Sequence, residues 1–328
     1  MRQANALIAL LCVVFLAPTV EARRVQIAVA TLRQSVLPLV VAKEKGYFRE
    51  EDLEVELILT TASVANMSLL GGNVDFISSG SSAMVAISRG APLKFIFIGF
   101  NRPMHWLYAK PEIKDVKGLK AKKIGVSAVG SSLHFLVLEI LKRYGLESTR
   151  AVTVLGVGTT ANRYAALHSG TIDATNLTPP YNFKAQEAGL RELVAFVKED
   201  YLVDLAGTIV VRESLFQSDP AVIEKLIRGM LKGLFHIRQS RSSTIPILAK
   251  LMKTQDNVAE KIYDMVLPGL TTDGSLNPEV QKRVIDFVSR VQGIQEPVTA
   301  EKVFDFSSVR RIRADLEIKK WKPISKRE

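Results

Sequence analysis

The sequence predicts an α/β protein made of two doubly wound lobes, joined by a two-strand hinge and followed by extra C-terminal helices. Three observations lead to this prediction. Apolar strands alternate with short helices, and the same order returns in the second half, as expected for parallel sheets covered by helices. LLGGNVDFISSG (69–80) is matched by ALHSGTIDATNL (166–177), with Asp75 and Asp173 at the same place, 98 positions apart (173 − 75). Strand patterns flank the second half, so the chain crosses between the lobes twice.

The first half contains four predicted strands separated by helices. RRVQIAVA alternates as a strand, and VLPLVVAKEKG follows as a helix with Pro38 in its first turn and Gly46 at its end. LEVELIL and VDFISSG are the next strands, with the helix TTASVANMSLLGG between them. A helix from about Ser81 to Arg89 stops at Gly90 and leads into the strand LKFIFIGF. This order predicts one sheet with helices on its faces.

The second half repeats this order. KKIGVSA, AVTVLGV and IDATNL are predicted strands, and VGSSLHFLVLEILKRYG, TTANRYAALHSG and PPYNFKAQEAG contain the helices between and after them. In the repeated corner a glycine closes the helix and an aspartate begins the strand. We therefore assign Asp75 and Asp173 to the start of a strand. Ligands of open parallel sheets lie at the opposite, carboxyl ends of the strands.

The two crossings define the predicted lobes. HWLYAK (105–110) and TIVVRE (208–213) flank the second half as strands, so the first lobe is predicted to comprise 23–108 plus 207–328 and the second 109–206. Beyond the second crossing comes a long helix with Asp219 as its N-cap and proline next, followed by helices at about 256–267 and 278–292. These helices are expected to add to the hydrophobic core and to cover the sheet.

Residues 1–22 are typical of a secretory signal peptide. Arg2 precedes an apolar run from Ala6 to Leu16, and small residues stand at the −3 and −1 positions of a cleavage site after Ala22. The run is too short to span a membrane as a helix. A buried N-terminal helix is the alternative interpretation. We expect an exported, periplasmic protein.

Cysteine content and charge exclude several kinds of site. The one cysteine, Cys12, lies in the apolar run, and the bulky Leu11 before it argues against a lipid anchor. The mature chain would then have no disulfide, thiolate metal site or cysteine nucleophile. The net charge of +11 comes from dispersed basic residues, without aromatic interleaving or a nucleic-acid reading motif. We expect no nucleic-acid partner.

Hydroxyl and small side chains recur where predicted strands end and helices begin. A helix N-terminus offers unpaired N–H groups and a positive dipole end, which suit an anionic or strongly accepting group. Each serine is also an ordinary N-cap, but the recurrence in both halves favours one shared ligand site. The predicted ligand-binding residues are Thr31, Arg33, Gln34, Ser35, Ser79, Ser81, Ser82, Asn101, Arg102, Ser131, Ser132, Thr178 and Tyr181.

The sequence contains no convincing catalytic pattern. The four histidines, at positions 105, 134, 168 and 236, lack metal-ligand spacing. GVSAVG (125–130) lacks the glycine that a nucleophile elbow needs two places after the serine. GVGTTA (156–161) fits G-x-G-x-x-A, but no acidic residue ends the following strand, where a dinucleotide ribose would be bound. We predict no catalytic residue, no metal and no cofactor.

Several motifs occur in a fixed order over about residues 25–215. They are K-G-Y-F, G-x-[VI]-D, R-G-A-P and D-V-K-G-L-K-x-K-K-I-G-V, and VFDFSSVRR follows near the end. In this order they resemble the solute-binding proteins of ABC transporters, in the branch that handles nitrate, sulfonates, taurine and thiamine pyrimidine precursors. The resemblance implies the type II periplasmic binding fold, with a small solute enclosed between two lobes and delivered to a permease driven by a separate ATPase.

We therefore expect a monomeric solute-binding protein and no enzyme activity. The N–H-rich loops suit a sulfonate, nitrate or carboxylate, whereas a pyrimidine-like solute would stack on Tyr181 or Trp106. Two alternatives stay open. One is a sensory protein that presents the solute to a membrane receptor. The other is an enzyme similar to the pyrimidine-precursor synthases, which rely on a cysteine-rich motif that the mature chain lacks.

Overall fold

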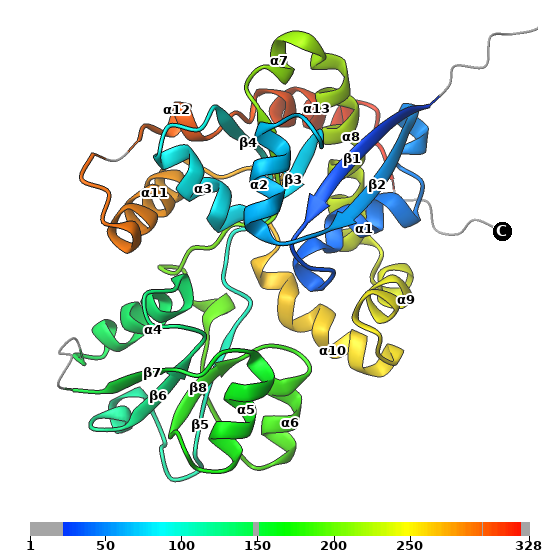
Figure 1. Cartoon of the computed structure of the whole chain (residues 1–328). Helices are drawn as coiled ribbons and strands as arrows, with labels where there is room; N and C mark the ends of the chain where they lie inside the picture. Colours follow the sequence, from blue (N-terminus) through cyan, green and yellow to red (C-terminus); the bar gives the residue numbers. More distant parts are fainter. Residues whose placement is uncertain (1–21, 147–150, 297, 323–328) are drawn as a thin grey trace, which may run out of the picture.

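The computed structural model describes residues 22–146, 151–296 and 298–322 and shows two lobes, one above the other in Figure 1. All of the predicted signal peptide except its last residue lies outside the described residues. Each lobe is built on a five-stranded sheet with helices packed against it, which confirms the predicted fold class. Within the described ranges, no helix is long and apolar enough to cross a membrane.

The strands of the first sheet are β1 (Arg23–Val29), β2 (Leu53–Leu59), β3 (Phe76–Ser78), β4 (Leu93–Phe100) and β10 (Ala206–Arg212). Their order in the sheet is β2-β1-β3-β10-β4. β1 runs parallel to β2 and β3, whereas β10 runs antiparallel to β3 and β4. The last strand of the sheet in sequence therefore lies between two strands from the first hundred residues.

The strands of the second sheet are β5 (Trp106–Ala109), β6 (Lys123–Val126), β7 (Thr153–Gly156), β8 (Ala174–Leu177) and β9 (Arg191–Ala195). Their order, β7-β6-β8-β5-β9, repeats the layout of the first sheet: three parallel strands come first, and an antiparallel strand follows. β9 was not predicted. It is short, begins with two exposed charged residues and forms the edge of the sheet beside β5, so its sequence has little strand character.

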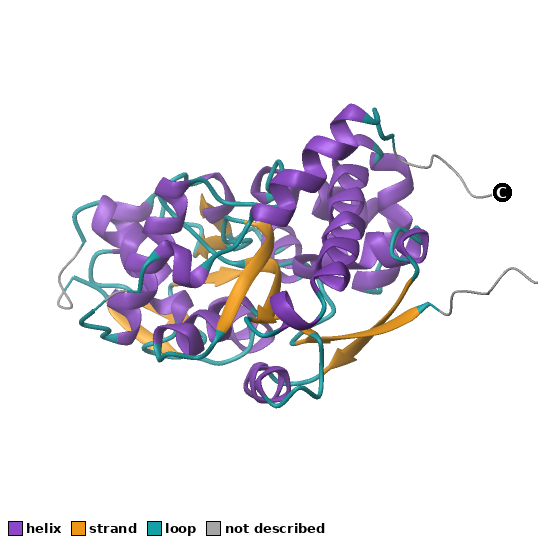
Figure 2. Cartoon of the chain, turned by 90° about the horizontal axis from the view of Figure 1, so that it is seen from above, coloured by secondary structure: helices purple, strands orange, loops and turns teal. Residues whose placement is uncertain are grey.

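Helices cover both sheets, as the view from above shows (Figure 2). The close contact between the first helix and the longest one requires Gly233, since a Cβ there would lie 2.9 Å from Ala42 Cβ. The helix of residues 241–252 was not predicted, because it contains Pro246 and begins with serines. The helices are α1 (Leu37–Glu44), α2 (Ala62–Leu70), α3 (Gly80–Ser88), α4 (Ser132–Arg143), α5 (Thr160–His168), α6 (Tyr181–Glu187), α7 (Leu215–Ser218), α8 (Pro220–Gln239), α9 (Arg241–Met252), α10 (Asp256–Val266), α11 (Pro278–Gln292), α12 (Ala300–Val303) and α13 (Ser307–Ile318).

Two segments cross between the lobes, as predicted. The first joins β4 to β5 and the second joins β9 to β10, and they meet where the Asp204 N–H donates to Asn101 O at 3.2 Å. The predicted lobe boundary at residue 108 falls inside β5, a strand of the second sheet. We therefore propose that the first lobe ends near Asn101, and that the second lobe extends from there to about Asp204.

The repeated corner has the predicted structural role in both lobes. Asp75 Oδ2 accepts from the Gln26 N–H of β1, and Asp173 Oδ2 accepts from the Lys123 N–H of β6, each at 2.9 Å. Asp173 Oδ1 also binds Lys110 Nζ at 2.7 Å. Burial alone would raise the pKa of Asp173, but these hydrogen bonds outweigh it and hold the pKa below its ordinary value. Each aspartate thus ties the start of one strand to its parallel neighbour.

Replacing Asp173 by asparagine is expected to lower the free energy of unfolding by about 1–2 kcal/mol, because a charge-assisted hydrogen bond and a partly buried ion pair are lost. Urea denaturation at pH 7 measures the loss. Since the pKa of this carboxyl is lowered in the folded state, its contribution is present at neutral pH and should disappear as the pH falls through that pKa. Glu112→Gln, an exposed change in the same lobe, is the control. Equal stability of the two variants would contradict this role.

Candidate functional site

A cavity of about 440 Å³ lies between the two lobes. Residues 31–35 of the first lobe form one wall, the N-terminus of α5 and the start of α6 form the other, and the two crossing segments form the base. A larger cavity, of about 750 Å³, lies on the first lobe alone. The interlobe cavity is lined by Thr31, Arg33, Gln34, Ser35, Met104, His105, Thr159, Thr160, Ala161, Thr178, Tyr181, Asp204 and Ala206.

Six of the predicted ligand-binding residues line this cavity. Four of them come from the loop and 3₁₀ turn after β1, and the other two follow β8. Both segments lie at the carboxyl ends of strands, where parallel sheets bind ligands. These six residues are Thr31, Arg33, Gln34, Ser35, Thr178 and Tyr181.

The other seven predicted residues do not line the cavity: Ser79, Ser81, Ser82, Asn101, Arg102, Ser131 and Ser132. Several have partners that account for them locally. Ser79 and Ser82 share a hydrogen bond of 2.7 Å, and Ser131 caps α4 by accepting from the His134 N–H at 3.3 Å. Asn101 joins the crossing segments through its carbonyl oxygen. At Ser79, Ser82 and Ser131 these local bonds give the side-chain hydroxyl a partner within the protein.

The N-terminus of α5 forms the second-lobe wall of the cavity. Thr159 is its N-cap and accepts from the Asn162 N–H at 3.2 Å. The N–H groups at the start of the helix have no intrahelical acceptor, and the helix dipole places partial positive charge there. The wall therefore suits an anionic group.

Arg163 lies directly behind this wall. It is 3% exposed, and its guanidinium donates to Asn176 O at 3.2 Å, to Thr160 Oγ1 at 3.1 Å and to Gly158 O. Among the described residues it has no carboxylate partner. Burial lowers the pKa of Arg163 to about 10, so the side chain stays positively charged at neutral pH. Because Thr160 Oγ1 accepts from Arg163, its hydroxyl proton can donate to a solute.

His105 adds a second donor. Its Nδ1 lies 3.2 Å from Asn176 Nδ2, and with the amide donating, the imidazole carries its proton on Nε2. Burial, followed by the charge of Arg163, lowers the pKa of His105 to about 4, so the ring is neutral at pH 7. In the described part of the chain Nε2 has no partner, and His105 lines the cavity. The ring can therefore donate one hydrogen bond to a solute.

Two further side chains have unfilled hydrogen-bonding capacity in the cavity. Gln34 is 5% exposed, and its Oε1 has no partner. Asp204 is the one carboxylate of the lining, and its Oδ1 accepts from the Leu205 N–H at 2.8 Å. Burial raises the pKa of Asp204. A buried polar group without a partner is costly, so a solute that pairs with these groups gains affinity.

Seven lining residues were not predicted: Met104, His105, Thr159, Thr160, Ala161, Asp204 and Ala206. Thr159 had a usable sequence pattern, since TTANRY follows a strand and opens a helix, as the predicted serines do. No local pattern marks the residues of the crossing segments, which reach the cavity only through the folding of both lobes. Within the described residues, no group of three or more histidine, cysteine, aspartate and glutamate side chains can hold a metal ion.

The family model "NMT1/THI5 like" matches residues 33–240, more than half of the chain. The chain belongs to the NMT1/THI5-like family. The match covers the wall of residues 33–35, the whole second lobe and both crossing segments, so the interlobe cavity lies within it, apart from Thr31. The branch that the sequence motifs resemble is thereby confirmed.

The NMT1/THI5-like chain has relatives of two kinds. It is 23% identical over 291 residues to a Bacillus subtilis protein assigned to the binding of aliphatic sulfonates, covering 85% of this chain and 86% of that one. It is 31% identical over 146 residues to the 4-amino-5-hydroxymethyl-2-methylpyrimidine phosphate synthase THI13 of Saccharomyces cerevisiae, covering 42% and 41%. The match to the binding protein is thus about twice as long as the match to the synthase.

The fold is also that of a known binding protein. The periplasmic aliphatic sulphonate-binding protein SsuA of Escherichia coli superposes with a TM-score of 0.69 at 20% identity, covering 93% of this chain and 94% of that one. This likeness confirms the predicted type II periplasmic binding fold. In its fold the NMT1/THI5-like chain is therefore similar, over nearly its whole length, to a periplasmic sulphonate-binding protein.

Proposed function

We propose that this protein is an extracytoplasmic solute-binding protein of an ABC importer. It binds a small organic anion, preferably a sulfonate that also carries an amine, and delivers it to a membrane permease. The observation that best supports this is a cavity of about 440 Å³ that is lined by hydrogen-bond donors from both lobes. That volume is in the range of about 300–1,000 Å³ typical of small-molecule sites.

The acid end of the solute faces the second lobe in this proposal. The α5 N-terminus, the Thr160 hydroxyl and His105 Nε2 all present donors there, and the charge of Arg163 lies behind them. Arg33 adds a charged donor from the first lobe. Because the donors belong to different lobes, the closed form makes contacts that the open form lacks, and solute binding shifts the hinge equilibrium toward closure.

Asp204 favours a solute with a positively charged group. It is the one carboxylate in a lining otherwise rich in donors, and burial raises its pKa. An ammonium group of the solute would pair with the ionised carboxylate and offset its desolvation. Amino-sulfonates combine this group with the anion that the opposite wall suits.

A synthase activity is the second candidate, because the yeast relative is a pyrimidine phosphate synthase. The cavity lining as described contains no cysteine and no lysine, which leaves His105 and Asp204 as candidates for proton transfer. The pKa of His105, about 4, makes it a weak base at neutral pH, and in the proposed complex Asp204 pairs with the ammonium group of the solute. We therefore propose binding without chemistry. A sensory role would use the same cavity with a receptor in place of the permease.

Calorimetric titration with taurine and 1-propanesulfonate tests the binding proposal. We expect one taurine per chain with a dissociation constant of about 1 µM, equivalent to about 8 kcal/mol. Asp204→Asn should weaken taurine binding by about tenfold and leave 1-propanesulfonate binding nearly unchanged. Asp200→Asn, an exposed change of the same charge, is the matched control.

Three results would count against the proposal. If neither sulfonate binds, the solute class is wrong. If Asp204→Asn weakens the binding of both compounds equally, the carboxylate does not recognise the amine. If a strain lacking this protein takes up labelled taurine at the normal rate, import is excluded and the sensory alternative gains support.

A further inference from the structure

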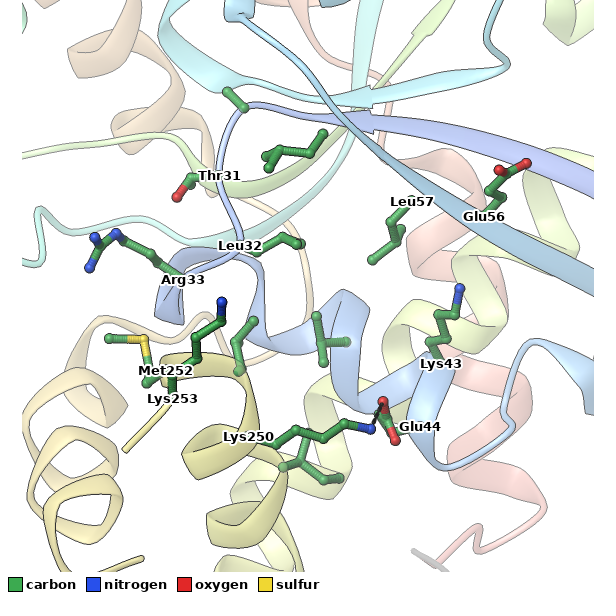
Figure 3. A pocket seen from close by; sticks show the side chains of 15 residues that line it. Thr31, Leu32, Arg33, Lys43, Glu44, Glu56, Leu57, Lys250, Met252 and Lys253 are labelled. Carbon is green, nitrogen blue, oxygen red and sulfur yellow. Dashed lines mark hydrogen bonds and ion pairs between the residues drawn. The ribbon is translucent and has the colours of Figure 1, made fainter. Parts of the chain in front are cut away.

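A second cavity lies outside the interlobe site. It has a volume of about 750 Å³ and lies on the first lobe, between β2, α1 and the last turns of α9 (Figure 3). Residues 30–33, which follow β1, close one end. We call this cavity the α9 groove. Its size is in the range of small-molecule sites.

Eight of the fifteen residues that line the α9 groove are apolar. Leu57 points into it from β2, and Leu32 points into it from the loop after β1 (Figure 3). Leu251 and Met252 add apolar surface from the end of α9. Leu32 is 42% exposed and Leu59, at the end of β2, is 61% exposed. Removing apolar surface from water contributes about 25 cal/mol of favourable free energy per Å². The groove therefore favours an apolar occupant.

The charged side chains of the groove differ between its two ends. Lys250 Nζ pairs with Glu44 at 3.0 Å, and Lys43 Nζ donates to Val55 O at 2.6 Å. Arg33 and Lys253 lie together at the opposite end (Figure 3) and have no ion pair within the described residues. The groove therefore has two neighbouring cations at one end, whereas the two lysines at the other end, Lys43 and Lys250, are balanced by the two lining carboxylates, Glu44 and Glu56.

We propose that the α9 groove binds a single-chain amphiphile with an anionic head, such as a medium-chain carboxylate. The head lies at Arg33 and Lys253, and the alkyl chain lies along Leu32 and Leu57 toward α1. A peptide or a second copy of this chain would not require two neighbouring cations at one end of the groove.

This site is connected to the interlobe cavity. Thr31 and Arg33 line both. An amphiphile in the groove therefore contacts the loop that forms the first-lobe wall of the other cavity. Binding at one site should change affinity at the other by the same factor, because coupling between two sites is reciprocal.

Calorimetric titration of the full mature chain with decanoate, below the concentration at which it forms micelles, tests the proposal. One decanoate should bind per chain, and decanol should bind at least tenfold more weakly. Lys253→Glu should weaken decanoate binding at least tenfold by placing a like charge beside the head. Lys261→Glu on α10, an equal change of charge on an exposed lysine outside the groove, should leave binding unchanged.

Leu57→Glu adds a test of the apolar wall and should also weaken decanoate binding tenfold. If that variant unfolds, Lys253→Glu still decides, because Lys253 is exposed. The proposal is overturned if decanoate does not bind, or if both lysine variants weaken decanoate binding equally. It is also overturned if sedimentation shows that Leu57→Glu dissociates a dimer, which would make the groove a subunit interface.

Discussion

Arg163→Met is expected to weaken taurine binding by about 10- to 100-fold. The substitution removes the positive charge behind the α5 N-terminus and frees Thr160 Oγ1 and Asn176 O from the guanidinium that orients them. Hydrogen bonds to charged groups contribute about 1.5–3 kcal/mol, and each 1.4 kcal/mol is a tenfold change in affinity. Calorimetric titration at low ionic strength measures the loss.

The same variant should change stability much less than affinity. Burying Arg163 without a carboxylate is costly, as its lowered pKa shows, and methionine removes that cost while it also removes three hydrogen bonds. These two effects oppose each other in the free energy of unfolding. Arg191→Met, an exposed change on β9, is the matched control for charge. A large fall in melting temperature with unchanged taurine affinity would show that Arg163 is purely structural.

Gly80→Ala is expected to be the most destabilising single-methyl addition that we propose. A Cβ at position 80 would lie 2.7 Å from Leu205 Cβ and closer still to Leu205 O, so the second crossing segment must move. Overpacking of this kind typically costs about 1–3 kcal/mol, and the contact with backbone places this case at about 3 kcal/mol. Because Asp204 and Ala206 flank Leu205 and line the interlobe cavity, affinity for taurine should fall as well.

Gly71→Ala is the control for that substitution. Gly71 ends α2 with an ordinary helical φ of −76°, and the nearest atom to an added Cβ is 3.3 Å away. Thermal unfolding should show a melting temperature within about 2 °C of wild type for Gly71→Ala and a fall of about 6–12 °C for Gly80→Ala. Equal melting temperatures would mean that the crossing segment moves to accommodate the added methyl group without a loss of stability.

The fold was predictable because its pattern is local and repeated. Gly72 and Gly170 end their helices with φ near +79° and +78°, and the aspartates that follow begin strands in both lobes. Such corners are visible in sequence, since glycine and aspartate have specific turn geometry. The edge strand β9 and the proline-containing helix α9 were missed because their stability comes from packing against neighbours, which short-range patterns do not record.

The site was less predictable, because it depends on which helix starts face each other. Ser131 and Thr159 look equivalent in sequence: each follows a strand and caps a helix. Only Thr159 lines the interlobe cavity. His105 and Asp204 reach it from crossing segments that are about a hundred residues apart and are joined by backbone hydrogen bonds. Their proximity is a property of the folded chain, and neither residue has a local motif.

The position of β10 between β3 and β4 determines the order in which the protein can form during synthesis. Residues 22–100 emerge first, yet their sheet has a gap until residue 212 is available. The second lobe is formed by one continuous stretch of the chain, which contains all five strands of its own sheet. It can therefore fold before the sheet of the first lobe is complete. The half of the protein made first is therefore the half completed last.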